Sequence, residues 1–244
     1  MITCKKEKAV KRLIHWTSVW SALCLFLFLS PLVVHTQTGH HQHPMPLDKY
    51  ISVLEDPKRD EWQKPEAVIQ ALKIQPGQYV ADIGAGSGYF TRHIARAVGE
   101  KGAVFALDVE EGMIEYLQQR LKKENLDNVK AIKVPAHDPL LIDSSLDLAF
   151  ICDVYHHLED RDIYMRKVRK ALKPTGRVAI VDFYPKETPV GPPMHLRLGE
   201  EVVEKELQAA GLKVTEKLPI LPYQYILIAQ PMTKESETSR PAGQ

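Results

Sequence analysis

Cysteine is scarce in this sequence, and its charges almost cancel. The three cysteines, Cys4, Cys24 and Cys152, lie far apart and match neither a disulfide framework nor a zinc-binding pattern. The 32 basic and 31 acidic residues leave no overall field that would attract nucleic acid. A disulfide-stapled domain, a zinc module and a nucleic-acid-binding protein that depends on net charge are therefore excluded.

The N-terminal segment, residues 1–35, differs from the rest of the 244-residue chain. Five basic residues precede 13–34, a stretch without Asp, Glu, Lys or Arg. This order predicts a signal peptide or a retained signal anchor, because the apolar stretch approaches the ~20 residues that span a bilayer. No A-x-A-like cleavage site follows it, so cleavage and retention both stay open. The remaining length and composition support one core of ordinary domain size.

The most informative stretch is an apolar run, 79–83, followed by glycines at alternate positions, Gly84, Gly86 and Gly88. Glycine tolerates positive φ and lets a ligand approach bare backbone, so the pattern indicates a nucleotide-type loop between a strand and a helix. Asp82 ends the strand. Its carboxylate would repel a pyrophosphate but suits a ligand with an ammonium and a sulfonium, which favours S-adenosylmethionine over NAD. A tight turn without a ligand is the alternative.

With D-I-G-A-G-S-G at 82–88, the chain resembles the class I (Rossmann-like) S-adenosylmethionine-dependent methyltransferases over about 65–231. It is similar to their small-molecule branch, typified by the ubiquinone/menaquinone C-methyltransferases. The resemblance implies an α/β fold: one doubly wound, mostly parallel seven-stranded sheet with an antiparallel last strand. The residue patterns predict strands at 79–83, 103–108, 129–135, 148–152, 177–183, 213–218 and 223–229, and helices at 161–172 and 200–210.

Cofactor-binding candidates follow from the spacing and from the resemblance. Asp108 ends the second strand about 20 residues past the glycines, where an acidic side chain can bind two ribose hydroxyls. The resemblance implies that Met113 packs against adenine and that Asp138 accepts a hydrogen bond from the adenine amino group. The full candidate set is Asp82, Gly84, Ala85, Gly86, Gly88, Tyr89, Asp108, Met113, Asp138 and Asp153.

Candidate catalytic residues, Tyr155, His156 and His157, follow the fourth strand. Imidazole titrates near working pH, so these side chains could act as a base if the acceptor carries a proton of high pKa. The alternative is that the tyrosine packs and the histidines hydrogen-bond locally. His195, on a loop near the same edge, is a weaker candidate. No metal site is expected.

The segments that flank the domain are predicted from composition. Residues 36–64 form a linker, whose histidines, His35 beside it and His40, His41 and His43 within it, suit a solvated spacer better than a metal-binding tract. The resemblance to the methyltransferases implies that the end of this linker, 50–64, can form a lid over the cofactor, with Trp62 either in the lid or packed in the core. Residues 232–244 are polar and predicted to be disordered.

The predicted function is methyl transfer from S-adenosylmethionine to a small or lipid-soluble acceptor. The alternatives are a catalytically silent cofactor-binding or interaction module, or a protein methyltransferase. A membrane-anchored or exported, extracytoplasmic protein is expected if 13–34 acts as a signal, with membrane association through this stretch, and a cytoplasmic protein otherwise. An exported domain would be separated from a cofactor that is made inside the cell.

Overall fold

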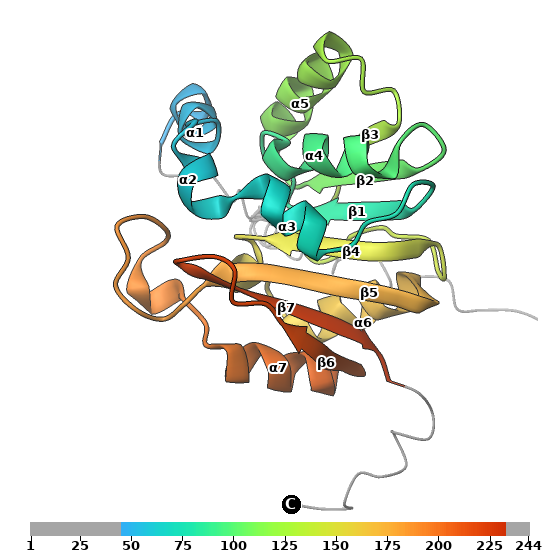
Figure 1. Ribbon diagram of the computed structural model, residues 1–244, viewed down its shortest axis with the longest axis vertical. Coiled ribbons are helices and arrows are strands. Elements are labelled where there is room, and N and C mark those ends of the chain that lie inside the picture. The colour runs from blue at the N-terminus through green and yellow to red at the C-terminus, as the bar shows by residue number, and fades with distance from the viewer. Residues whose placement is uncertain (1–44, 233–244) are drawn as a thin grey trace, which may run out of the picture. The chain divides into compact units, whose positions relative to one another are not determined.

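A computed structural model describes residues 45–232 of the chain (Figure 1). Seven strands form one sheet in the order β3-β2-β1-β4-β5-β7-β6, in which β1 to β5 are parallel and β7 runs antiparallel to both β5 and β6. This confirms the predicted doubly wound sheet. The strands are β1 Tyr79–Ile83, β2 Ala103–Asp108, β3 Val129–Lys133, β4 Leu146–Cys152, β5 Leu172–Phe183, β6 Leu212–Lys217 and β7 Gln224–Pro231.

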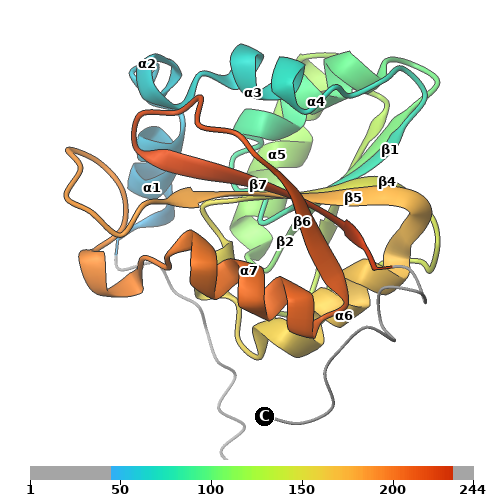
Figure 2. The same ribbon diagram turned by 60° about the horizontal axis from the view of Figure 1, so that its bottom comes forward.

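Helices cover both faces of the sheet (Figures 1 and 2). Apolar side chains of α3, α4 and α5 pack on one face, and those of α6 and α7 pack on the other. Each of these helices buries one apolar stripe, as an amphipathic helix requires. The helices are α1 Leu47–Leu54, α2 Arg59–Gln63, α3 Pro65–Ala71, α4 Tyr89–Val98, α5 Glu111–Lys123, α6 Arg161–Ala171 and α7 Glu200–Ala209, with short 3₁₀ turns η1 Tyr155–His157 and η2 Met194–Leu196.

The central strands are buried on both sides, which explains their uninterrupted apolar sequences. In β1 every residue from Val80 to Ile83 is buried, including Asp82. The edge strand β3 is mostly half-buried or exposed. The strand that carries the glycine loop is therefore held between β2 and β4 at the centre of the fold.

Several predicted strand boundaries differ from the observed ones by one or more residues, including those of β3, β4, β5 and β7. β5 begins at Leu172 rather than at residue 177, because Leu172 already pairs with Leu146 and residues 173–176 form an irregularity before Arg177 pairs with Leu148. At Gly176 an added Cβ would lie 2.7 Å from the Leu146 carbonyl oxygen, so glycine permits the close approach. β3 ends two residues before the expected Pro135, which has no N–H for a ladder.

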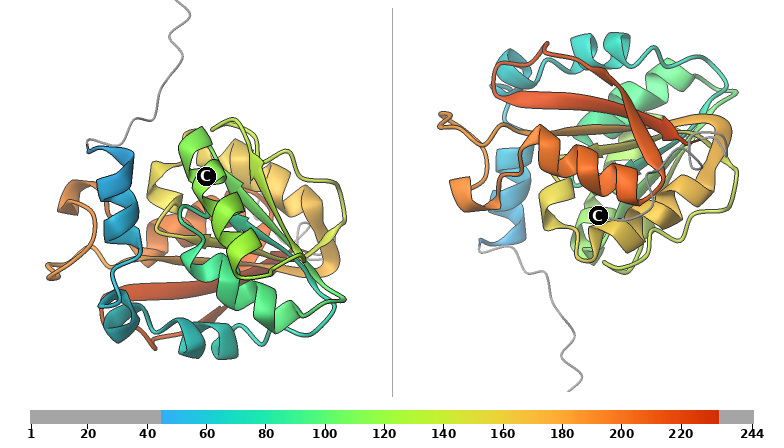
Figure 3. Two further views of the ribbon diagram at one scale, coloured as in Figure 1. Left: turned by 90° about the horizontal axis from the view of Figure 1, so that it is seen from above. Right: turned by 90° about the horizontal axis from the view of Figure 1, so that it is seen from below.

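Part of the predicted linker is helical. Within it, α1 and α2 pack on the body of the domain, where the Trp62 ring lies 5.6 Å from Phe183 and 6.3 Å from Tyr223, centroid to centroid. Figure 3 shows α1 at the same end of the sheet as the loop that follows β5. Carboxyl ends of the parallel strands also meet at this end, so both segments adjoin the position expected for a ligand.

Several predictions concern residues outside the described range. These are the signal or anchor segment at 1–35, the four histidines His35, His40, His41 and His43, and the tail after Met232. Between residues 45 and 232, no helix is both long and apolar enough to cross a membrane.

Candidate functional site

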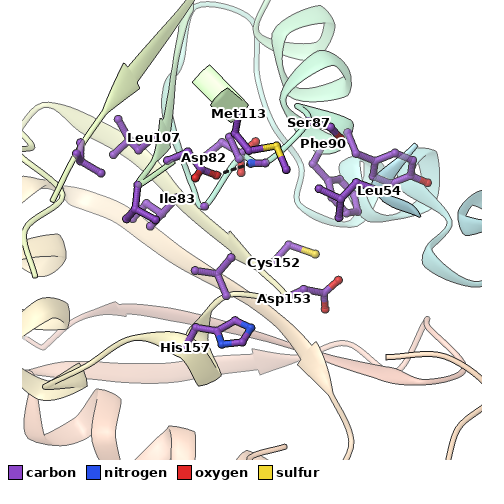
Figure 4. A pocket seen from close by; sticks show the side chains of 18 of the residues that line it. Leu54, Asp82, Ile83, Ser87, Phe90, Leu107, Met113, Cys152, Asp153 and His157 are labelled. Atoms are coloured by element: carbon purple, nitrogen blue, oxygen red, sulfur yellow. Dashed lines mark hydrogen bonds between the residues drawn. The ribbon is translucent and has the colours of Figure 1, made fainter. Parts of the chain in front are cut away.

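The carboxyl ends of β1, β2 and β4 open into a cavity of about 340 Å³ (Figure 4). Asp82 and Met113 lie on one side of it, and Asp153 and His157 lie on the other. A cleft outside the carboxyl ends of parallel strands is where open α/β sheets bind their ligands.

The glycine loop adopts a backbone that other residues would strain. Gly84, Gly86 and Gly88 have φ values of +73°, +54° and +81°. The N–H groups of Gly84 and Ala85 both donate to the Leu107 carbonyl, at 2.8 and 2.9 Å, which fixes the loop against β2. A Cβ on Gly84 would lie 2.3 Å from a methyl group of Val154. The absence of side chains thus keeps bare backbone along the cavity wall.

Asp108 is held by backbone donors on the rim of the cavity. Its Oδ2 accepts from the Gly86 N–H at 2.8 Å, and its Oδ1 accepts from the Glu110 N–H at 3.0 Å. Each carboxylate oxygen has further lone-pair capacity. The fixed carboxylate lines the cavity, so it fits the two hydroxyls of a ribose.

Asp82 is a buried carboxyl group, 3% exposed, beside the loop. Burial raises the pKa of Asp82 to about 7, although the Thr91 hydroxyl, which donates to it at 2.5 Å, acts in the opposite direction. A cationic ligand near this group would favour its ionised form. Asp82 therefore suits the ammonium or sulfonium of S-adenosylmethionine and disfavours a pyrophosphate.

Asp153 provides a second carboxyl group on the opposite wall, half-buried and with a left-handed backbone at φ +58°. Gln63 of α2 donates to its Oδ2 at 2.9 Å, and Gln224 of β7 donates to its Oδ1. Burial, and then the nearby Asp182, raise the pKa of Asp153 to about 6. Asp153 therefore links α2 to β7 through these two hydrogen bonds, and it also lines the cavity.

The structure does not bring Asp138 to the cavity. Its carboxylate accepts hydrogen bonds from Lys167 Nζ at 2.8 Å and the Leu140 N–H at 2.9 Å, and the bond from Lys167 lowers its pKa. From the same loop, Ala136 lines the cavity instead, as does Met113 of α5. Met113 is buried, which fits the apolar wall that an adenine ring requires.

Of the three candidate catalytic side chains, the cavity includes only His157. Tyr155 is buried and donates from its hydroxyl to Glu206 at 2.9 Å; burial raises its pKa. His156 is buried against Asp182. Among the remaining cofactor candidates, Ala85 and Tyr89 line the cavity. Gly88, the residue before α4, is not among the lining residues.

Three lining residues from α1 and α2 were missed by the sequence analysis: Tyr50, Leu54 and Arg59. The Arg59 guanidinium lies 4.1 Å from the centre of the Tyr89 ring, and Tyr89 donates from its hydroxyl to Asp60. Charged and apolar residues alternate without a motif in this segment. Helical spacing of Tyr50 and Leu54 was the available signal, because residues four apart share one face.

Charged side chains hold α1 against the body. Glu55, which follows α1, pairs with Arg92 of α4 at 3.3 Å and with Arg120 of α5. Both arginines also pair with Glu124, at 3.4 and 3.0 Å. All four side chains are largely buried, so the network is less screened than an exposed pair. These ion pairs fix the end of α1 to α4, the helix that follows the glycine loop, and to α5.

Comparisons with known proteins agree with this geometry. Residues 74–223 match the family described as "Methyltransferase domain". The ubiquinone/menaquinone biosynthesis C-methyltransferase of Vibrio vulnificus is 31% identical over 116 residues, which make up 47% of this chain and 45% of that relative. The chain thus spans less than half the length of this curated relative.

Solved structures share the architecture. A SAM-dependent methyltransferase from Aquifex aeolicus has a TM-score of 0.72 and 30% identity, covering 76% of this chain and 98% of that chain. The 1,6-didemethyltoxoflavin-N1-methyltransferase of Burkholderia thailandensis, at 19% identity and a TM-score of 0.55, covers 79% of this chain and 93% of that chain and shares the fold alone. The fold, the glycine loop with its two carboxylates and these matches show that the chain belongs to the class I S-adenosylmethionine-dependent methyltransferases.

Proposed function

We propose that this protein transfers the methyl group of S-adenosylmethionine to a small, lipid-soluble acceptor of the quinol type. Support for the acceptor class comes from the ubiquinone/menaquinone C-methyltransferases that the chain resembles. The observation that carries the proposal is the combination, in one cavity, of carboxyl groups on the cofactor side and an apolar wall beside one imidazole.

Different residues of the cavity suit different parts of the cofactor. Asp108 would hold the ribose hydroxyls, and Asp82 would face the positive charge of the methionine part. Met113 and Ala136 supply an apolar surface for the adenine ring.

The side of the cavity that holds His157 combines apolar side chains with the imidazole and the carboxyl group of Asp153. Val154 and Leu158, which follow β4, line this side together with His157. The apolar side chains suit a ring without charge, and the carboxyl group disfavours an anionic acceptor, which would lose its hydration on entry. An apolar wall of this kind is typical of sites for small organic ligands.

The cofactor, when bound, supplies a methyl group on a positively charged sulfur, already activated for displacement. The protein contributes orientation, since holding the acceptor atom in line accounts for much of the acceleration in such reactions. His157 would accept the proton that the acceptor loses as its new bond to carbon forms.

Methyl transfer by the purified full chain in mild detergent tests the proposal. Labelled S-adenosylmethionine is offered with a short-chain prenylated naphthoquinol, with a simple phenol and with a protein extract. Label should enter the organic-soluble quinol product, and His157→Gln should lower this rate by about 100-fold, within the range of general-base effects. Label found only in protein, or no transfer to either small acceptor, would refute the acceptor class.

A further inference from the structure

Asp182, near the end of β5, is a fully buried carboxylate with an unusual set of partners. It is 0% exposed. Both of its oxygens lie 2.9 Å from Nδ1 of His156. It also accepts from the backbone N–H groups of Phe183, at 2.8 Å, and His156, at 3.3 Å. These contacts fix the position of the His156 ring on the turn after β4.

The His156 ring is equally enclosed. Its side chain is 2% exposed, and Nε2 has no hydrogen-bond partner among the described residues. Its ring centre lies 4.1 Å from that of His157, at an interplanar angle of 46°. His157 is the neighbour that reaches the cavity, as Figure 4 shows. A continuous set of contacts therefore runs from the carboxylate of Asp182 to the cavity wall.

Fold stability alone gives a weak reason for such a pair. Burying an ionisable pair removes both groups from water, and well-packed apolar side chains of similar size commonly serve the fold as well or better. Val181 and Phe183, on either side of Asp182 in the strand, are both buried, as is Tyr225, which pairs with Asp182 in the β5–β7 register. Asp182 is thus an ionisable residue within the apolar stretch 178–183, and its contacts with His156 suggest a functional role.

We propose that His156 and Asp182 form a positioning pair, which holds the His157 imidazole in one orientation toward the acceptor. Asp182 fixes the His156 ring, and that ring restricts the rotation of the His157 ring that packs against it. The proposal rests on the proposed function, since it takes His157 as the acceptor-facing base. His156 and Asp182 act through His157 and have no contact with the cavity of their own.

The test compares Asp182→Asn and His156→Gln with Tyr225→Phe in the full chain. Tyr225 is the matched control because it pairs with Asp182 in the β5–β7 register, is equally buried, and its hydroxyl has no hydrogen-bond partner within residues 45–232. Adenosylhomocysteine affinity is measured by calorimetry, kcat and acceptor KM with the naphthoquinol, and the His157 ring signals by NMR of ¹⁵N-histidine-labelled protein.

Both pair variants should bind adenosylhomocysteine within about twofold of the unmodified protein and lower kcat by about 100-fold, the size expected for misplacing a reacting group. Acceptor KM should change little, and Tyr225→Phe should match the unmodified protein. In NMR, the single set of His157 ring signals should broaden or divide in both pair variants. Two substitutions keep the test decisive if one of them does not fold.

Unchanged kcat together with unchanged His157 signals in the pair variants would overturn the proposal. So would losses that follow thermal stability and appear equally in Tyr225→Phe. If the unmodified protein binds adenosylhomocysteine but transfers no methyl group, the proposed acceptor fails, and the NMR comparison still decides whether the pair positions His157. The two failures are therefore distinguishable.

Discussion

Replacing Gly84 by alanine should destabilise the protein far more than the same change at Gly77. Both glycines have left-handed backbones, with φ +73° and +87°. That conformation costs a residue with a Cβ about 1–2 kcal/mol. At Gly77 nothing lies within 4 Å of an added Cβ, whereas at Gly84 three atoms of Val154 lie within 3.0 Å of it.

The difference in the free energy of unfolding between Gly84→Ala and Gly77→Ala measures the cost of the steric clash with Val154. Overpacking a well-packed site typically costs about 1–3 kcal/mol, so Gly84→Ala should lose roughly 2–5 kcal/mol in total and Gly77→Ala roughly 1–2 kcal/mol. Val154 follows β4 and Gly84 follows β1, so the clash lies between two neighbouring strand ends on the cavity wall. Adenosylhomocysteine binding should weaken in Gly84→Ala and stay unchanged in Gly77→Ala.

Urea denaturation of the four proteins Gly84→Ala, Val154→Ala, the double variant and Gly77→Ala measures these free energies. In the double variant the smaller side chain makes room, so it should lose less than the sum of the two single losses, with a coupling of about 1–2 kcal/mol. Additive losses in the double variant, or equal losses at Gly84 and Gly77, would refute the assignment of Val154 as the contact.

Three further predictions concern the carboxylates and the N-terminal segment. Asp108→Ala should weaken adenosylhomocysteine binding by about 1.5–3 kcal/mol for each charge-assisted bond lost, while Asp138→Ala, whose carboxylate pairs with Lys167, should change it little; equal losses in calorimetry would contradict this. The raised pKa of Asp82 means that the folded state holds a proton that the unfolded state releases. The contribution of this group to the free energy of unfolding should therefore fall as pH rises from about 4 to about 7. Asp82→Asn should remove this pH dependence in urea denaturation recorded across the same range. Deleting 1–34 should leave a soluble protein that still binds adenosylhomocysteine, whereas the full chain should be membrane-associated or exported; intact full-length chain in the soluble cytosolic fraction would contradict the signal or anchor hypothesis.

The elements that the sequence predicted best are those with a strong local signal. Both β1 and β2 have the predicted bounds, because each is an apolar run with an aspartate at its last or next-to-last residue and is followed by loop residues. The position of Asp108 on the cavity wall also follows from spacing along the chain. In each case the decisive information lies within about 25 residues, where strand, loop and helix succeed one another without long-range contacts.

Contacts between distant segments account for the parts that the sequence did not predict. Asp138 follows β3 as expected, yet Lys167, on a helix 29 residues later, binds its carboxylate. Arg59 reaches the cavity only because α2 packs over the glycine loop and its Tyr89. No local pattern encodes either partner, since each depends on where a separate helix settles on the sheet.

Three aspartates occupy similar positions in the sequence but have different hydrogen-bond partners in the fold. Asp82, Asp153 and Asp182 each lie at or just after the end of an apolar strand, and β1, β4 and β5 are neighbours in the sheet, so the three residues lie at the same edge of the sheet. Their hydrogen-bond donors then separate them: a threonine hydroxyl for the first, two glutamine amides for the second, an imidazole for the third. The first two line the cavity and the third lies behind it. A positive ligand would therefore meet two carboxyl groups directly, while the third acts only through the imidazole that it holds.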